Sequence, residues 1–465
     1  MKQYLLLSLL IFSFFANAKS NSKPNFIIIL TDDQGYADLG CFGNPNVKTP
    51  HIDQMAAEGA KLSSFYMAAA ICTPSRAALM TACYPKRIGM ADGVFLAGDP
   101  KGLNPKEITI AEVAKSAGYT TGMFGKWHLG DQLEFLPTRQ GFDEFFGLPY
   151  SHDIHPYHLN QKKHKFPPLP VLEHEKVVET DPDADYLTKR ITDRAVDFIK
   201  KHKTKPFLMY VAHPIPHRPL HMSPPFMQAV PTTLRELIAK NEKQNKNIDY
   251  HNRDKLYPHT VSEIDWSVGQ ILNELKKQGI DENTFVLFSS DNGPSKHALG
   301  TTKPYRGNKG SFLEGGVRVP TVVRWPAKIP AGQDNQALLT SMDILPTIAN
   351  IVGYKFPDDR KIDGKDMLPA LMQKEKTPHD YFFYHIKNEL RAVRHESWKL
   401  YVAKNKATAL YDLVTDKQEK VNIMAKHPQL VDQMLKEVIN FNNEISNHIR
   451  PAATVENPKK LSMAN

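Results

Sequence analysis

The chain has 465 residues and a formal net charge of +9, from 59 lysines and arginines against 50 aspartates and glutamates. Hydrophobic residues make up 41% and charged residues 23%, which is typical of globular proteins and excludes wholesale disorder. Three cysteines are too few for a disulfide framework or for a cysteine-rich zinc or iron–sulfur site. The positive charge suits an anionic substrate but does not identify one.

The first residues of the chain predict export. Lys2 precedes an almost wholly apolar run over residues 5–15, and Ala16-Asn17-Ala18 fits a small-x-small cleavage site. The run is too short to anchor the chain in a bilayer. The polar residues 19–23 that follow at once disfavour the alternative of a buried first helix. We therefore expect residues 1–18 to be a signal peptide, and the mature protein to be periplasmic or secreted, with no membrane anchor.

Strands and helices are predicted to alternate along most of the chain. Asn25 to Leu30, Phe207 to Val211 and Thr284 to Ser289 are continuous apolar runs, which are typical of strands buried on both faces of a parallel sheet. Between them, apolar residues recur at helical spacing over residues 187–198 and 261–275. The pattern predicts the α/β class, with a large, mostly parallel sheet sandwiched by helices. The ligand site of such a sheet lies at the carboxyl ends of its strands.

The composition changes after roughly residue 370. We expect one large domain over residues 19–370 and a smaller α+β subdomain over residues 371–465. The subdomain should contain an antiparallel sheet of short strands and one amphipathic helix, at residues 381–384, 391–394, 398–402, 409–413 and 430–441. Residues 241–255 are polar and are predicted to form an exposed loop.

Cys72-Thr73-Pro74-Ser75-Arg76 is the strongest local signal in the chain. Pro74 can occupy the first position of a helix, which would place Cys72 where unpaired backbone N–H groups favour negative charge. From these residues two interpretations stay open. Cys72 is either an activated thiolate, with Arg76 one turn along to bind an oxyanion, or a buried structural thiol.

With this motif the chain resembles the formylglycine-dependent sulfatases, from about residue 23 to the last predicted helix. The second signature of that family, G-Y-x-T-x-x-x-G-K-x-H, is present over residues 118–128. Ala82 departs from the family pattern, because the first signature usually ends in glycine there, and Phe124 is bulkier than usual before Gly125. Neither residue carries a reactive group. The resemblance implies an alkaline-phosphatase-like fold and a sulfuric ester hydrolase whose large domain is catalytic.

The resemblance implies both the nucleophile and the cofactor. Cys72 would be oxidised during export by a maturation enzyme to formylglycine, whose hydrated aldehyde attacks sulfur. One divalent cation would be held by Asp32, Asp33, Asp291 and Asn292, together with the residue made from Cys72. Each acidic pair alone would be interpreted as a turn or cap, but both pairs directly follow apolar strands. Their oxygen donors select Ca²⁺, or Mg²⁺, over zinc.

The remaining matching positions would neutralise charge or transfer protons. Lys126, Lys309 and the guanidinium of Arg76 would surround the sulfate oxygens. Asp291 would take the proton of the attacking hydroxyl, and His128 would remove that of the second hydroxyl so that sulfate can leave.

Two assignments depend on local context. His217, followed by Arg-Pro, fits the family histidine that protonates the departing alcohol better than His213, which we expect to be a loop histidine. Ser151 matches a serine that contacts sulfate in the branch of arylsulfatase A and N-acetylgalactosamine-6-sulfatase. For His152 and Asp153, substrate contacts and loop structure remain equally open.

The resemblance also implies the substrate class. We expect a sulfated carbohydrate, from a glycosaminoglycan or an algal galactan, and no nucleic-acid partner. Loops carry specificity, and the candidate selectivity residues on loops are His152, Asp153, Arg218, His297, Tyr305 and Arg306.

Two other functions are alternatives to this one. A phosphoester hydrolase of the same superfamily would typically use a serine or threonine nucleophile and two zinc ions. A non-catalytic binder of sulfated polysaccharide would show gaps among the catalytic positions, and the sequence has none. Cys41 and Cys83 could form one disulfide or stay separate, and their spacing does not decide between these.

Overall fold

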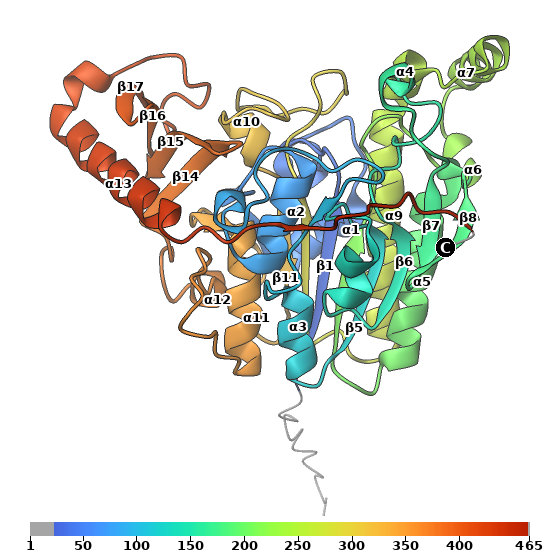
Figure 1. Cartoon of the computed structure of the whole chain (residues 1–465), viewed down its shortest axis with the longest axis horizontal. Helices are drawn as coiled ribbons and strands as arrows, with labels where there is room; N and C mark the ends of the chain where they lie inside the picture. Colours follow the sequence, from blue (N-terminus) through green and yellow to red (C-terminus); the bar gives the residue numbers. More distant parts are fainter. Residues whose placement is uncertain (1–22, 464–465) are drawn as a thin grey trace, which may run out of the picture.

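The computed structural model of the chain describes residues 23–463 (Figure 1). The predicted signal peptide lies outside the described residues. The centre of the molecule is a ten-stranded sheet. In sheet order its strands are β12 (Gln333–Asn335), β2 (Ala60–Leu62), β11 (Val322–Arg324), β10 (Thr284–Ser290), β1 (Asn25–Thr31), β9 (Phe207–Ala212), β5 (Thr120–Lys126), β6 (Glu144–Leu148), β7 (Pro170–Glu173) and β8 (Lys176–Thr180).

The middle of this sheet is parallel. Strands β10, β1, β9, β5 and β6 all run in the same direction. Antiparallel pairing occurs toward the two edges, where β11 pairs with β10 and β2, and β7 pairs with β6 and β8. The predicted fold class, a mostly parallel α/β sheet, is confirmed.

Strand β1 shows why the sheet needs helices on both faces. All seven of its residues are buried, and successive side chains point to opposite faces of a sheet. Phe26, Ile28 and Leu30 pack beneath α2, α3 and α11, whereas Ile27 and Ile29 pack beneath α1, α5 and α9. These helices are α1 (Pro50–Ala57), α2 (Cys72–Thr81), α3 (Ile110–Ser116), α5 (Leu187–His202), α9 (Tyr257–Lys277) and α11 (Ile344–Val352).

Residues 381–412 form a second, smaller sheet that lies to one side of the first (Figure 1). It is antiparallel, with the strand order β14-β15-β16-β17. A long helix, α13, packs its apolar side against this sheet. The elements are β14 (Tyr381–Ile386), β15 (Glu389–His395), β16 (Trp398–Ala403), β17 (Lys406–Asp412) and α13 (Pro428–Ser446). The predicted α+β subdomain is therefore present, while its boundary at residues 370 and 371 stays a prediction.

The prediction of an exposed loop over residues 241–255 was wrong. Helix α7 (Thr232–Asn245) extends into this segment, and a short helix α8 (Tyr250–Arg253) follows it. Polar side chains hold the segment in place, because Arg253 Nε donates to Glu242 Oε1 at 2.6 Å. Asp249 also caps α8 by accepting from the backbone of Asn252. Ion pairs and a cap, rather than an apolar face, stabilise these helices.

The remaining short helices lie mainly on the loops. They are α4 (Gln161–His164), α6 (Pro224–Met227), α10 (Glu314–Val317) and α12 (Leu368–Leu371). Across residues 23–463, no helix is both long and apolar enough to cross a membrane.

Candidate active site

The carboxyl ends of three parallel strands bring the candidate residues together. Asp32 and Asp33 directly follow β1, Asp291 directly follows β10, and Lys126 is the last residue of β5. Helix α2 adds Cys72 at its first residue. Pro74 is thus the third helical residue and not the first, a position where the missing N–H of proline is still tolerated.

Cys72 lies between carboxylates on one side and a lysine on the other. Its Sγ atom is 3.4 Å from Asp32 Oδ1 and 3.2 Å from Lys309 Nζ. The side chain is 1% exposed. Burial, and then the charges of Asp291 and Asp32, raise the pKa of the Cys72 thiol well above its ordinary value. The surroundings therefore favour the protonated thiol and disfavour the activated-thiolate interpretation.

Three cationic side chains surround the carboxylates. Lys126 Nζ forms an ion pair with Asp32 and donates to Ser151 Oγ at 3.1 Å. Lys309 Nζ lies 2.7 Å from Asp33 Oδ1. Burial alone would raise the pKa of Asp32, but Lys126, His217, Arg76 and Lys309 hold it well below its ordinary value.

Arg76 is fully buried behind the reactive groups. Its Nε donates to Asp291 Oδ2 at 3.0 Å, and its Nη1 donates to the carbonyl of Lys126 at 3.0 Å. The guanidinium thus fixes a carboxylate and the end of β5, which is a positioning role rather than direct contact with an oxyanion. Burial and the nearby charge of Asp32 raise the pKa of Asp291 to about 6, so this carboxyl can take up a proton.

His128 is held as a neutral base. Its Nε2 donates to the carbonyl of Phe95 at 2.9 Å, because a carbonyl can only accept. The other nitrogen, Nδ1, is buried and has no hydrogen-bond partner. Burial, followed by the charges of Lys126 and Arg76, lowers the pKa of His128 well below its ordinary value. A neutral ring with a free lone pair is what proton abstraction requires.

The two candidate histidines lie in different surroundings. His217 Nε2 is 3.7 Å from Asp33 Oδ2, and its Nδ1 donates to the carbonyl of Arg218 at 2.7 Å. His213 is fully buried, and its Nε2 contacts Ser267 Oγ of α9 at 3.1 Å. The structure therefore brings His217, and not His213, to the carboxylate cluster.

Ser151 and its two neighbours form one wall of the site. Ser151 is 3% exposed and contacts Lys126. His152 Nε2 donates to the carbonyl of Pro219 at 3.0 Å, and its buried Nδ1 has no partner. Asp153 is 3.4 Å from His158. The ring centroids of His152 and His217 lie 5.7 Å apart, so this wall packs against the loop that carries His217.

The residues present fit a divalent cation. Donor atoms of Asp32, Asp33, Cys72 and Asp291 all lie within 4.8 Å of one another. Asn292 donates its amide nitrogen to Asp33 Oδ1 at 2.7 Å, which leaves its buried Oδ1 without a partner in the cluster. A buried, unsatisfied carbonyl-type oxygen beside three carboxylates suits a hard cation such as Ca²⁺ or Mg²⁺.

The net charge of the cluster shows what a bound divalent cation would change. Three carboxylates, on Asp32, Asp33 and Asp291, face the three cationic groups of Lys126, Lys309 and Arg76. The cluster is therefore close to neutral by itself. A divalent cation would make it positive and thus able to attract an anionic ester into a buried site.

Backbone conformation explains two of the family glycine positions. Gly125 has φ +113°, and a Cβ there would lie 2.0 Å from the carbonyl oxygen of Ala212. Only glycine allows β5 and β9 to approach this closely. Ala82 ends α2 in the left-handed region at φ 58°, where its N–H donates to the carbonyl of Ala78. Glycine adopts this conformation at lower cost, which is the reason for its usual presence at that position.

Sequence reasoning missed the groups that support the site. Thr73 donates its hydroxyl to the carbonyl of His128 at 2.8 Å, and Ser75 donates its hydroxyl to the carbonyl of Asp291. Both residues stand inside the cysteine motif, so their polar side chains were the available signal. Asp33 and His128 adopt left-handed backbone conformations, with φ of 65° and 63°, which nothing in the local sequence indicates.

The candidate selectivity residues divide into two groups. Arg218 forms a two-point ion pair with Asp254, and Tyr305 is buried against Tyr36. His297 and Arg306 are exposed. Among the described residues Cys41 and Cys83 are both free thiols, so they stay separate.

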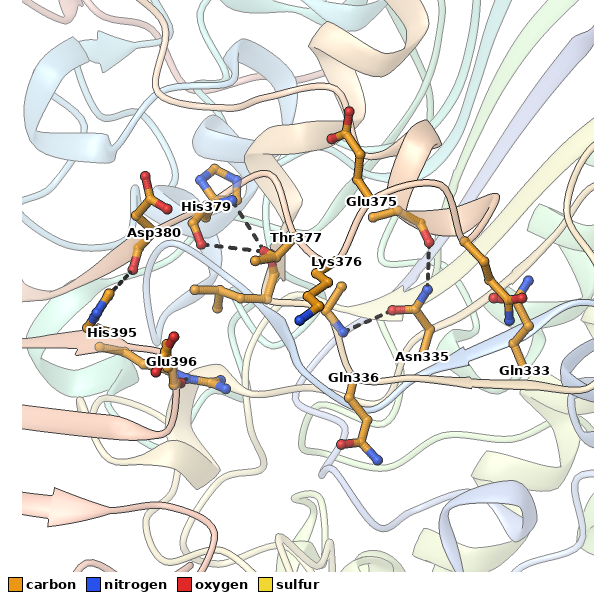
Figure 2. A pocket seen from close by; sticks show the side chains of 15 residues that line it. Gln333, Asn335, Gln336, Glu375, Lys376, Thr377, His379, Asp380, His395 and Glu396 are labelled. Carbon is orange, nitrogen blue, oxygen red and sulfur yellow. Dashed lines mark hydrogen bonds between the residues drawn. The ribbon is translucent and has the colours of Figure 1, made fainter.

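A polar cleft of about 580 Å³ lies elsewhere, between β12, the segment around residue 377 and β15 (Figure 2). Its polar groups mainly bond within the cleft wall: Asn335 donates to the carbonyl of Ala370, and His379 lies 2.7 Å from Asp343. None of the candidate catalytic residues lines it. We assign this cleft no catalytic role.

A parallel α/β sheet whose carboxyl edge holds a buried cysteine among carboxylates and lysines defines a hydrolase of anionic esters. Residues 24–354 match the family described as Sulfatase, and residues 308–444 match the one described as N-sulphoglucosamine sulphohydrolase, C-terminal. The chain therefore belongs to the sulfatase family and is an enzyme that hydrolyses sulfate esters.

Individual relatives agree with this assignment. Rat steryl-sulfatase is 33% identical over 460 residues (82% of this chain, 76% of the relative), and human arylsulfatase A is 35% identical over 383 residues (78% and 70%). Mouse N-acetylgalactosamine-6-sulfatase is 36% identical over 407 residues (83% and 73%). Among solved structures, the chain is similar to the crystal structure of Ps i-CgsB in complex with k-i-k-neocarrahexaose. The two sequences are 31% identical, and the structures align with a TM-score of 0.79 over 92% of this chain and 95% of that one. The resemblance to the arylsulfatase A and N-acetylgalactosamine-6-sulfatase branch is confirmed.

Proposed function

We propose that this protein is an exported sulfatase that removes sulfate from a sulfated carbohydrate, using formylglycine made from Cys72 and one divalent cation, Ca²⁺ or Mg²⁺. The observation that carries the proposal is the position of Cys72, whose Sγ lies 3.4 Å from Asp32 and 3.2 Å from Lys309. A nucleophile at this position has carboxylates on one side and a cation for the sulfate oxygens on the other.

Asp32, Asp33, Asp291 and Asn292 would hold the cation, with the residue made from Cys72. When bound, the cation neutralises sulfate oxygens and makes the hydroxyl of the hydrated formylglycine more acidic. Lys126 and Lys309 bind the remaining sulfate oxygens, and Ser151 orients Lys126 through its 3.1 Å contact. Arg76 keeps Asp291 in place by its hydrogen bond to Oδ2.

Three side chains then move protons. Asp291, whose pKa lies at about 6, accepts the proton of the attacking hydroxyl. His217 protonates the departing alcohol from Nε2, because Nδ1 is committed to the carbonyl of Arg218. His128 accepts a proton at Nδ1 when sulfate leaves, since this nitrogen has no other partner. General acid–base terms of this kind contribute about 10²–10⁴-fold each.

The names of several relatives support a sugar substrate. One relative is an N-acetylgalactosamine-6-sulfatase, and one solved neighbour is in complex with k-i-k-neocarrahexaose. Steryl-sulfatase, by contrast, acts on a sterol sulfate by its name. Galactose-configured sugars from glycosaminoglycans or algal galactans are therefore the substrates to test first.

The function can be tested by a desulfation screen read by mass spectrometry. Purified protein that has been co-expressed with a maturation enzyme is incubated with sulfated galactose and N-acetylgalactosamine oligosaccharides, a steroid sulfate and matching phosphate esters. We expect loss of one sulfate, about 80 Da, from at least one sugar, a mass fixed by the chemistry of the ester. Turnover of the steroid sulfate alone would contradict the carbohydrate proposal, and turnover of phosphate esters alone would favour the phosphoester hydrolase.

A separate experiment tests the cation. Chelation should abolish activity, Ca²⁺ or Mg²⁺ should restore it, and titration calorimetry of unmodified protein should find one site per chain. Asn292→Ala should weaken the cation affinity about 10–100-fold, the scale for disturbing a metal site, because the unpaired Oδ1 is lost. Asn440→Ala on the exposed side of α13 is the matched control and should bind normally. Two bound zinc ions per chain would instead favour the phosphoester hydrolase.

A further inference from the structure

Two loops at the mouth of the site contain no acidic residue. The first rim loop comprises residues 155–165 and begins four residues after Ser151. The second rim loop comprises residues 295–306 and begins three residues after Asn292. Both follow segments that carry candidate site residues, because the first comes after Ser151 to Asp153 and the second comes after β10 and Asn292.

Five lysines on these loops form no ion pair with another described residue. Lys162, Lys163 and Lys165 of the first rim loop are exposed, as are Lys296 and Lys303 of the second. Ion pairs are common elsewhere among residues 23–463, but none of these five lysines forms one. Their charge is therefore available to an external anion.

Large apolar side chains are exposed on the same loops. Tyr157 is 55% exposed, Leu159 is 64% exposed and Leu299 is 58% exposed. A charged face that only contacts water does not need such residues beside its lysines. Free lysines next to an exposed aromatic ring and aliphatic groups suit a ligand that is both anionic and, on its ring faces, apolar, as sulfated sugars are.

Both loops are held by contacts with neighbouring segments, the first of them through Asp153 in the wall formed by Ser151, His152 and Asp153. His158 Nε2 lies 3.4 Å from Asp153 Oδ2, and the rings of His158 and His164 both pack on Phe166. In the second rim loop, the N–H of Thr301 donates to Asp38 Oδ1 at 2.8 Å. Helix α4, within the first rim loop, lies at the same end of the molecule as α10, which follows the second (Figure 1).

We infer that the two rim loops bind the sugars that flank the sulfate being removed, so that the substrate is a sulfated polysaccharide chain with several sulfates. This inference depends on the proposed carbohydrate sulfatase function. A monosaccharide sulfate or steroid sulfate occupies the buried cluster and leaves the rim lysines unused. A chain with repeated sulfates carries further negative charges that these lysines can attract, provided that the charges come within a Debye length, about 8–10 Å.

The test compares substrates of different length in matched variants. Lys162→Gln/Lys163→Gln and Lys296→Gln/Lys303→Gln remove rim charge, and Lys404→Gln/Lys406→Gln removes the same charge from the exposed β16–β17 turn, far from the site. Each variant is assayed on carrageenan, chondroitin sulfate, galactose 6-sulfate and 4-nitrophenyl sulfate. Unchanged 4-nitrophenyl sulfate turnover shows that the fold and the catalytic cluster are intact.

We expect the rim variants combined to lower kcat/KM on the polymer about tenfold at low salt, mainly through KM, because steering by surface charge weakens. The loss should shrink at high salt, and the turn variant should behave as the wild type. Tyr157→Ala should lower polymer kcat/KM without this salt dependence. Equal polymer kinetics in rim variants and wild type, or equal losses on galactose 6-sulfate, would overturn the inference.

A binding experiment separates this inference from the proposed function. Unmodified protein, which needs no activity, is applied to immobilised carrageenan and eluted with salt. Wild type and the turn variant should elute at the same salt concentration, and the rim variants should elute earlier. Identical elution of all three would count against the rim even if the enzyme proved active, whereas retention by the rim of an inactive enzyme would count against the proposed function alone.

Discussion

Cys72→Ala should abolish sulfate ester hydrolysis while the protein stays folded. The side chain is buried at the first residue of α2, and its Sγ lies within hydrogen-bond distance of Asp32 and Lys309. Removing the nucleophile should cost on the order of 10⁴-fold or more in kcat, with whatever catalysis remains due to binding alone. Circular dichroism and the melting temperature should change little.

Mass spectrometry provides the readout that does not depend on activity. Co-expression with a maturation enzyme should yield a peptide about 18 Da lighter at residue 72, the consequence of exchanging a thiol for an aldehyde. Cys72→Ser is the conservative control. It keeps a polar group at the site, and it should bind the substrate without turning it over. Full sulfatase activity from protein whose Cys72 is unmodified would falsify the assignment of this residue as the precursor.

The surroundings of Cys72 support the proposed modification. Burial and the charges of Asp291 and Asp32 raise the pKa of the Cys72 thiol well above its ordinary value, which disfavours the thiolate. An unmodified cysteine here is a poor nucleophile. A site that crowds carboxylates around a thiol suits a nucleophile whose acidity a bound cation can increase.

The central fold could be predicted because its signals are local. Strands β1, β9 and β10 are buried on both faces. Their sequences are therefore continuous apolar runs, without the alternation of apolar and polar residues that half-exposed strands show. The site residues at the ends of β1 and β10 followed from the same reasoning, since parallel strands end at one edge. The segment over residues 241–255 failed because ion pairs such as Arg253 with Glu242 stabilise its helices, and hydrophobic periodicity does not report them.

Contacts between segments that are distant in the sequence could not be predicted from it either. Lys399, in the C-terminal subdomain, is fully buried and donates to the carbonyl of Phe312 at 2.9 Å and to Glu314 at 2.9 Å. The N–H of Glu314 in turn donates to Glu419 at 3.0 Å. Charged side chains of the small subdomain thus hold the segment that carries Lys309. The residues in contact are 85 or more positions apart in the sequence. A lone lysine in a predicted strand gives no sign of this.

His217→Ala should show a loss of activity that depends on the leaving group. If His217 donates a proton to the departing alcohol, its absence matters most when that alcohol is a poor leaving group. A sugar hydroxyl has a pKa of about 12–14 and needs the proton, whereas an activated aryl alcohol near about 7 hardly does. We therefore expect a loss of about 10²–10⁴-fold in kcat/KM on a sugar sulfate and a much smaller loss on 4-nitrophenyl sulfate.

His213→Ala is the matched control, because both histidines are on the segment that follows β9 but only His217 reaches the site. His213 contacts Ser267 on α9 and is fully buried, so its loss should lower stability and affect both substrates alike. His217 Nε2, by contrast, is 3.7 Å from Asp33 while Nδ1 is held by the carbonyl of Arg218. With the Nδ1 proton committed to this carbonyl, the second proton of the protonated ring lies on Nε2, the nitrogen that faces the site. Equal losses on both substrates in His217→Ala, or a leaving-group contrast at His213, would mean that another group protonates the alcohol.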